Sequence, residues 1–291
     1  MVPASKKGRG VILVDGEGFE FQSADPTKCD DLVGYLSQVS KQLLEGEKEK
    51  APEIKSLPKV VDYDYVKDEY DVLTNLPIGV NVNKIEIYKY NFLGKKVNII
   101  SGGDSEIMLP YVRSLIELIS MKKDTLKAIV FDGENYMSNL KSNVTYVNKE
   151  YSKRIDAFSG WVDNISEKTK QTLVFFVGLS KINEEDEEFS FKFATLIEKM
   201  SKSNKVNAVI IDEIDEIRTH SSQMWYSSYV STDSLIFVGN GLDSQYIFQI
   251  KGDGQEIREK IPDNFGFVLS KGKPIKIQLL EVISQEDNNE K

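Results

Sequence analysis

Cysteine and histidine are almost missing from this sequence of 291 residues, which contains one of each, Cys29 and His220. A single cysteine cannot form an internal disulfide or a cysteine-based metal cluster, which suits a reducing compartment. A single histidine excludes a multi-histidine zinc site. The sequence therefore argues against disulfide scaffolds and zinc enzymes.

Long apolar runs and excess positive charge are also missing. No run approaches the roughly 20 apolar residues that span a bilayer, and the N-terminus has no signal-peptide core. We therefore expect a soluble cytoplasmic domain without direct membrane insertion. The net charge of −9 disfavours sequence-independent DNA binding, which relies on Lys and Arg. We expect no nucleic-acid partner, so a DNA-translocating motor is disfavoured.

What the sequence does contain is an alternation of short buried strands and amphipathic helices from Lys95 onward. With 40% hydrophobic residues, a large core can be buried. This alternation predicts an α/β fold with a mostly parallel sheet covered on both faces. A further helix is expected over about 30–45, and Pro77–Val80 is expected to form a turn before a strand at 84–90. We expect strands at 97–100, 128–131, 173–177, 206–211 and 235–238, and helices at 107–121, 150–168 and 187–201.

Two predicted hairpins with glycine turns, near the two ends of the chain, align without a gap at an offset of 256 residues (266 minus 10). One interpretation is that the same hairpin closes two successive repeats, so that residues 1–24 close a preceding domain. The other is chance, because glycine is expected at hairpin turns anyway. The identical pairs are Gly10 and Gly266, Leu13 and Leu269, Gly16 and Gly272, and Gln22 and Gln278.

A degenerate phosphate-binding loop follows the strand at 97–100. A P-loop has Gly, four residues, and then Gly-Lys-Ser/Thr between a strand and a helix. Here Ile107–Leu109 stand in place of Gly-Lys-Ser/Thr. The candidate cofactor-binding residues are Gly102, Gly103, Asp104, Ser105 and Glu106.

Each substitution in this loop removes a part of nucleotide chemistry. Met108 cannot neutralise phosphates, Leu109 cannot hold Mg²⁺, and a β-branched Ile107 disfavours a positive φ. Asp104 and Glu106 add negative charge. We therefore assign no catalytic residue, metal ligand or cofactor. Weak binding of ATP and Mg²⁺ at the helix N-terminus stays open, as does an ordinary βα turn.

Three further features have competing interpretations. Asp212 and Glu213 follow an apolar strand as a Walker B pair does, but they lie on the fourth strand of the series. We favour a strand end followed by an acidic helix start. His220 lies next to two serines without a nucleophile elbow, so we expect it in a polar surface loop. The segment Gly239–Leu242 is either a ligand site or a turn, and the tail 284–291 is expected to be disordered.

Several of these segments together resemble the FtsK/SpoIIIE-type ATPases of type VII secretion. They are Phe237–Gln245, Asn264–Val268 and the turn at Gly102, while Pro77–Gly79 resembles the start of each ATPase core. Gly8–Ala24 resembles the end of a preceding ATPase domain in such tandem proteins. The resemblance covers essentially the whole chain and is closest to the C-terminal third ATPase domain of Firmicutes such as staphylococci.

This resemblance implies a RecA/FtsK-like P-loop NTPase fold, a three-layer sandwich with added β-hairpins. It implies a degenerate ATPase domain over 25–283 in a membrane-anchored motor that exports WXG100-type substrates. The implied partners are these substrates, neighbouring ATPase domains, other secretion components and, for the whole protein, a homo-hexamer.

The catalytic residues of the family cannot be carried over, because Met108, Leu109, Gly178 and Leu179 depart from its pattern. We therefore expect substrate recognition and motor assembly rather than hydrolysis. The alternative is a weak ATPase that a neighbouring subunit of the hexamer completes, with Asp212 and Glu213 contributing.

Overall fold

The computed structural model describes residues 9–14, 17–23, 31–46, 55–140, 143–252 and 254–281. The chain forms two compact units, Met1–Lys55 and Ser56–Lys291. The tail predicted at 284–291 lies outside the described residues. None of the helices in the described ranges combines the length and apolarity needed to cross a membrane.

Unit 1 contains the predicted hairpin and the predicted helix. Strands β1 (Arg9–Val14) and β2 (Glu17–Gln22) pair antiparallel, and α1 spans Leu32–Gly46. Two apolar side chains of α1, Val33 and Leu36, are exposed. The hydrophobic spacing thus predicts this helix correctly.

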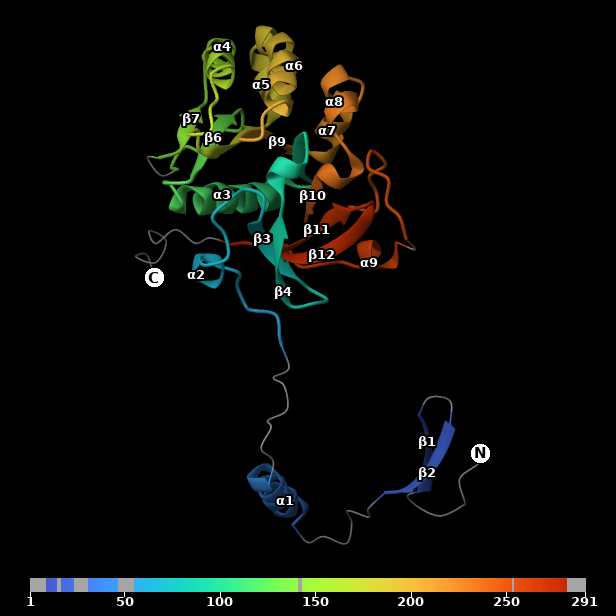
Figure 1. Ribbon diagram of the computed structural model, residues 1–291. Helices are drawn as coiled ribbons and strands as arrows, with labels where there is room; N and C mark the ends of the chain where they lie inside the picture. The colour runs from blue at the N-terminus through green and yellow to red at the C-terminus, as the bar shows by residue number, and fades with distance from the viewer. Residues whose placement is uncertain are drawn as a thin grey trace. The chain divides into compact units, whose positions relative to one another are not determined.

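Unit 2 is built on a ten-stranded sheet within Leu76–Leu279, shown in Figure 1. The strands from β10 to β7 are parallel, and the other four extend the sheet antiparallel. In sheet order the strands are β4 (Glu86–Tyr90), β3 (Leu76–Asn81), β12 (Lys273–Leu279), β11 (Phe265–Ser270), β10 (Leu235–Val238), β5 (Val97–Gly102), β9 (Val206–Glu213), β8 (Gln171–Val177), β6 (Leu126–Asp132) and β7 (Thr145–Val147).

Helices cover both faces of this sheet and bury two hydrophobic clusters. Helix α3 packs on one face, and α4 to α8 lie on the other (Figure 1). The predicted three-layer α/β architecture is therefore confirmed. The helices of this unit are α2 (Tyr63–Val66), α3 (Ser105–Met121), α4 (Tyr151–Val162), α5 (Leu179–Glu185), α6 (Glu187–Ser201), α7 (Ile214–His220), α8 (Met224–Tyr229) and α9 (Gln255–Arg258), with 3₁₀ turns at Phe92–Gly94 and Thr232–Ser234.

Three predicted boundaries were wrong for identifiable reasons. The expected turn at Pro77–Val80 is part of the buried strand β3, which accommodates proline because the pairing with β4 shifts between Pro77 and Gly79. Helix α3 begins two residues early because Asp104 caps it. Helix α4 ends at Val162 rather than near residue 168, where Ser166 and Thr169 form a turn instead.

The predicted C-terminal hairpin, β11–β12, fills a position between β10 and β3. Its Gly266 lies against β10 so closely that a Cβ atom there would be 2.4 Å from the carbonyl oxygen of Phe237. That oxygen belongs to the backbone of a buried strand and has little room to shift. Any side chain at position 266 must therefore strain the sheet.

We predict that Gly266→Ala lowers the free energy of unfolding by about 1–3 kcal/mol, the usual cost of overpacking. Gly160→Ala is the matched control, because nothing lies within 4 Å of a Cβ at this exposed position in α4. That change should stabilise the protein by about 0.5–1 kcal/mol. Urea denaturation measures both, and equal effects would contradict the close approach.

Candidate functional site

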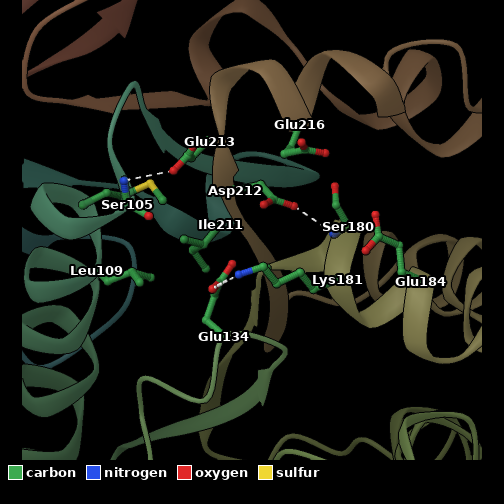
Figure 2. Close-up of a pocket in the computed structure, with 12 residues that line it drawn as sticks. Ser105, Leu109, Glu134, Ser180, Lys181, Glu184, Ile211, Asp212, Glu213 and Glu216 are labelled. Carbon is green, nitrogen blue, oxygen red and sulfur yellow. Dashed lines mark hydrogen bonds and ion pairs between the residues drawn. The ribbon is translucent and has the colours of Figure 1, made fainter.

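The carboxyl ends of β5, β9 and β8 meet at one edge of the sheet. Strands β5 and β9 are direct neighbours, with Gly102 opposite Glu213 and Ser101 opposite Asp212. Open α/β sheets bind their ligands at this kind of edge. The structure thus brings together two candidates that the sequence presents separately, the degenerate P-loop and the Asp212–Glu213 pair (Figure 2).

The degenerate P-loop is shorter than its sequence pattern, because only Gly103 and Asp104 separate β5 from α3. Two amides at the start of α3 are hydrogen-bonded to carboxylates of the protein itself. The Ser105 amide donates to Glu213 Oε1 at 3.2 Å, and the Glu106 amide donates to Asp104 Oδ1 at 2.8 Å. These are donors that a helix N-terminus would otherwise offer to a phosphate.

The residues that replace the P-loop signature belong to the core. Met108 is 1% exposed and Leu109 is 6% exposed, and both lie in the cluster under α3. Gly102 is required by strand packing, because a Cβ atom there would be 2.7 Å from the carbonyl oxygen of Val238 on β10. A glycine is therefore needed at this position whether or not a phosphate binds.

A pocket of about 210 Å³ opens beside this loop, between α3, α5 and the end of β9. Its lining contains five carboxylates and a single lysine, Lys181, which forms an ion pair with Glu134. A triphosphate brought here would face like charges at short range. The acidic lining residues are Glu134, Glu184, Asp212, Glu213 and Glu216.

No group of three or more His, Cys, Asp or Glu side chains in the described part of the chain is arranged to hold a metal ion. The carboxylates of the pocket lie around it without converging on one point (Figure 2). Asp212 Oδ2 already accepts a hydrogen bond from the Ser180 amide at 2.9 Å, and Glu213 Oε1 accepts one from Ser105. The arrangement therefore holds α3 and α5 against β9.

Burial raises the pKa of Asp212 to about 7, against an ordinary value of 3.8. Hydrogen bonds from the amide and hydroxyl of Ser180 act in the opposite direction, and the nearby Glu216 and Glu134 add to the increase. Near neutral pH this carboxyl is therefore only partly ionised. Its proton occupancy depends on pH in a range where ordinary carboxyl groups do not titrate.

His220 is buried, so the surface loop predicted for it is wrong. It is the last residue of α7, and a chain of hydrogen bonds holds its ring. The indole N–H of Trp225 donates to Gln223 Oε1, which leaves the Gln223 amide to donate to His220 Nδ1 at 3.3 Å. The other ring nitrogen, Nε2, then carries the proton and donates to Ser180 Oγ at 3.1 Å.

This tautomer cannot accept a proton from Ser180. Burial also lowers the pKa of His220, which keeps the ring neutral. The structure pairs His220 with a serine from α5 rather than with its two neighbours in sequence, and it gives this pair a structural role. The chain of hydrogen bonds ties α5 to α7 and α8 behind the acidic pocket.

The aromatic residues of α8 and the Gly239–Leu242 segment serve packing. Trp225 and Tyr226 are buried, with Trp225 edge-on to Phe193 at 5.3 Å. The segment after β10 is a turn in which the Asn240 amide group brackets the backbone of Ile261, donating at 3.0 Å and accepting at 2.8 Å. Of the two interpretations of Gly239–Leu242, these contacts favour the turn.

Solved structures of other proteins share the α/β architecture of this chain. No family model matches the chain, and no curated protein matches its sequence. Among solved structures, EssC (ATPases 2 and 3) from Geobacillus thermodenitrificans is similar with a TM-score of 0.67 at 15% identity, over 95% of this chain and 56% of that one. This chain has the fold of type VII secretion ATPase domains.

A second solved structure is EccC (ATPases 2 and 3) from Thermomonospora curvata in complex with a signal sequence peptide. Its TM-score is 0.61 at 15% identity, over 97% of this chain and 55% of that one. This chain spans little more than half the length of either structure. The similarity therefore shows a shared fold over the part of those proteins that this chain covers.

Sequence reasoning missed most of the pocket lining. Ser180, Lys181 and Glu184 lie on α5, whose seven residues are too few to show a helical period. Glu134 follows β6 in a turn and carries no motif. The available signal was Gly178, a glycine directly after a buried strand that begins α5 with a positive φ of 66°.

We predict that Asp212→Asn abolishes a pH dependence of stability. Between about pH 4 and 7 the Asp212 carboxyl keeps its proton in the folded state and loses it in the unfolded state. The free energy of unfolding therefore decreases as the pH rises through this range. A shift of about three pKa units corresponds to at most about 4 kcal/mol. Urea denaturation at pH 5 and pH 8 should show the variant gaining stability relative to the parent at pH 8. An equal difference at the two pH values would contradict the raised pKa.

Proposed function

We propose that this chain is a degenerate ATPase domain of a type VII secretion motor that recognises secreted WXG100-type substrates and supports motor assembly. The observation that carries the first part is the donation of the Ser105 and Glu106 amides to Glu213 and Asp104. A nucleotide would have to displace two internal carboxylates and enter an acidic pocket without a P-loop lysine. The shared fold of the type VII secretion ATPases supports the second part.

Substrate recognition needs a surface, and a notch between α3 and the end of β12 has suitable chemistry. Its volume is about 260 Å³, and its lining contains no lysine or arginine. Apolar side chains form its walls, with carboxylates among them. The apolar lining residues are Ile107, Pro110, Tyr111, Leu279 and Leu280, and the acidic ones are Glu106, Asp263 and Glu281.

We propose that this notch takes apolar side chains of a helical or C-terminal substrate segment that also carries a basic residue. An amphipathic helix typically places its apolar face in such a depression. The EccC structure with a signal sequence peptide supports peptide recognition by this fold. The negative rim would favour a positively charged segment and would make binding sensitive to salt.

The remaining partners follow from the same proposal. The similar EssC and EccC structures each contain two ATPase domains, which supports a tandem arrangement with neighbouring ATPase domains. We further propose a cytoplasmic location in a membrane-anchored protein, contacts with other secretion components, and a hexamer of the whole protein.

We predict no saturable binding of ATP up to about 1 mM, with or without Mg²⁺, which corresponds to less than about 4 kcal/mol of binding free energy. Calorimetry measures binding, and phosphate release measures turnover. Measurable turnover that Asp212→Ala abolishes would overturn this prediction. It would instead support a weak ATPase completed by a neighbouring subunit.

We predict that a C-terminal peptide of a WXG100-type substrate binds the chain, and that Ile107→Asp weakens binding at least about tenfold, or 1.4 kcal/mol. The change places a charge in an apolar wall that already has an acidic rim. Phe191→Asp on α6 is the matched control, because Phe191 is 82% exposed and lies outside the notch. Calorimetric titration compares the two, and equal effects would exclude the notch as the site.

A further inference from the structure

The two hairpins that align in sequence are also the same in structure. Each contains six cross-strand pairs. In β1–β2 the first pair is Arg9 with Gln22 and the last is Val14 with Glu17. In β11–β12 the first pair is Phe265 with Gln278 and the last is Ser270 with Lys273. Every pair of the first hairpin becomes a pair of the second when 256 is added to both numbers. The offset read from the sequence is therefore a structural equivalence, strand by strand and in register.

In unit 2, both outer edges of this hairpin are used. Strand β11 pairs antiparallel with β10, where Phe267 is opposite Phe237, and β12 pairs antiparallel with β3, where Gln278 is opposite Val80. The hairpin thus fills a slot two strands wide. Without it, β10 and β3 would each have an open edge, which sheets normally avoid.

The two hairpins differ sharply in how far their apolar side chains are covered. Val268 and Ile277 are 1% and 0% exposed, whereas their equivalents Ile12 and Phe21 are 54% and 48% exposed. Phe19, opposite Ile12 in the ladder, is 50% exposed. These three side chains share one face of β1–β2, because cross-strand partners point the same way. The equivalent face of β11–β12 packs into the cluster under α3.

Gly10 and its equivalent Gly266 are both closely approached, but by different groups. Its equivalent, Gly266, must be glycine because the backbone of β10 lies against it. At Gly10 the nearest atoms to a Cβ would be those of the Phe21 ring, at 2.7 Å, and this is a side chain of the same hairpin that can move aside. The glycine at position 10 therefore leaves the outer edge of β1 as open to a neighbouring strand as Gly266 leaves β11 to β10.

We infer that β1–β2 completes the sheet of a second domain with the fold of unit 2. It would lie between that domain's counterparts of β10 and β3, with Ile12, Phe19 and Phe21 packed under its counterpart of α3. The intact unit 2 of another copy is not the acceptor, because its slot already holds β11–β12. The partner is a domain of this fold whose slot is open. This inference rests on the hairpin and is independent of nucleotide or substrate binding.

The decisive experiment is a swap within the full chain, in which the sequence of residues 10–22 replaces residues 266–278. The swapped chain should keep a single cooperative unfolding transition and slow hydrogen exchange of the β10 amides. A swap that also carries valine in place of the Gly10 equivalent should lose both properties. A scrambled insert of the same composition is the second control. If the swap protects β10 no better than the scrambled insert does, the inference is overturned.

A second measurement tests docking itself. Deleting residues 265–279 leaves a chain that has the β1–β2 hairpin and an open slot. Exchange of the β1–β2 amides should then slow at least about tenfold relative to the intact chain, whether the hairpin fills a slot in its own molecule or in another. Adding Gly10→Val should restore fast exchange. Equally fast exchange in both chains, with the circular dichroism of unit 2 retained, would overturn the inference.

Discussion

The amide of Ser105 donates a hydrogen bond to the carboxylate of Glu213, and the character of the whole sheet edge depends on this contact. It joins the first residue of α3 to the last residue of β9, and it is available because β5 and β9 are parallel neighbours with Gly102 opposite Glu213. The positive end of a helix dipole is thereby neutralised from inside the protein. The place where a P-loop protein attracts a phosphate is here an internal contact between two elements.

The surrounding residues also make internal contacts instead of offering groups to a ligand. Met108 and Leu109 stand where a P-loop has its cation and hydroxyl, and they fill the core instead. Ser180 joins Asp212 and His220, which holds α5 against β9 and α7. The architecture of a nucleotide-binding edge is kept, while two donors at the start of α3 and the Ser180 amide are used in contacts within the protein.

Two surfaces have suitable properties, and the closing hairpin is central to both. In unit 2, the end of β12 supplies Leu279 to one wall of the notch, and α3 supplies the other wall. In unit 1, an equivalent hairpin has its apolar face exposed. The same supersecondary element therefore completes a sheet and lines a notch in unit 2, and it has exposed apolar side chains in unit 1.

The sequence by itself determined the parallel strands, both hairpins, the helices of ordinary length, and the absence of the Gly-Lys-Ser/Thr signature at Ile107–Leu109. Each of these follows from local periodicity, turn residues or the chemistry of single side chains. Short helices such as α5 were not predicted, because seven residues are too few to show a helical period.

Only the tertiary structure decided which strands are neighbours. Pairing of β5 with β9 joins residues more than a hundred positions apart, and local pattern contains no information about it. That pairing brings Glu213 to the Ser105 amide. Long-range packing likewise buries His220 beside Ser180, although its neighbours in sequence are polar. The fold class was thus readable from the sequence, whereas the closed state of the site arises from contacts that exist only once the chain has folded.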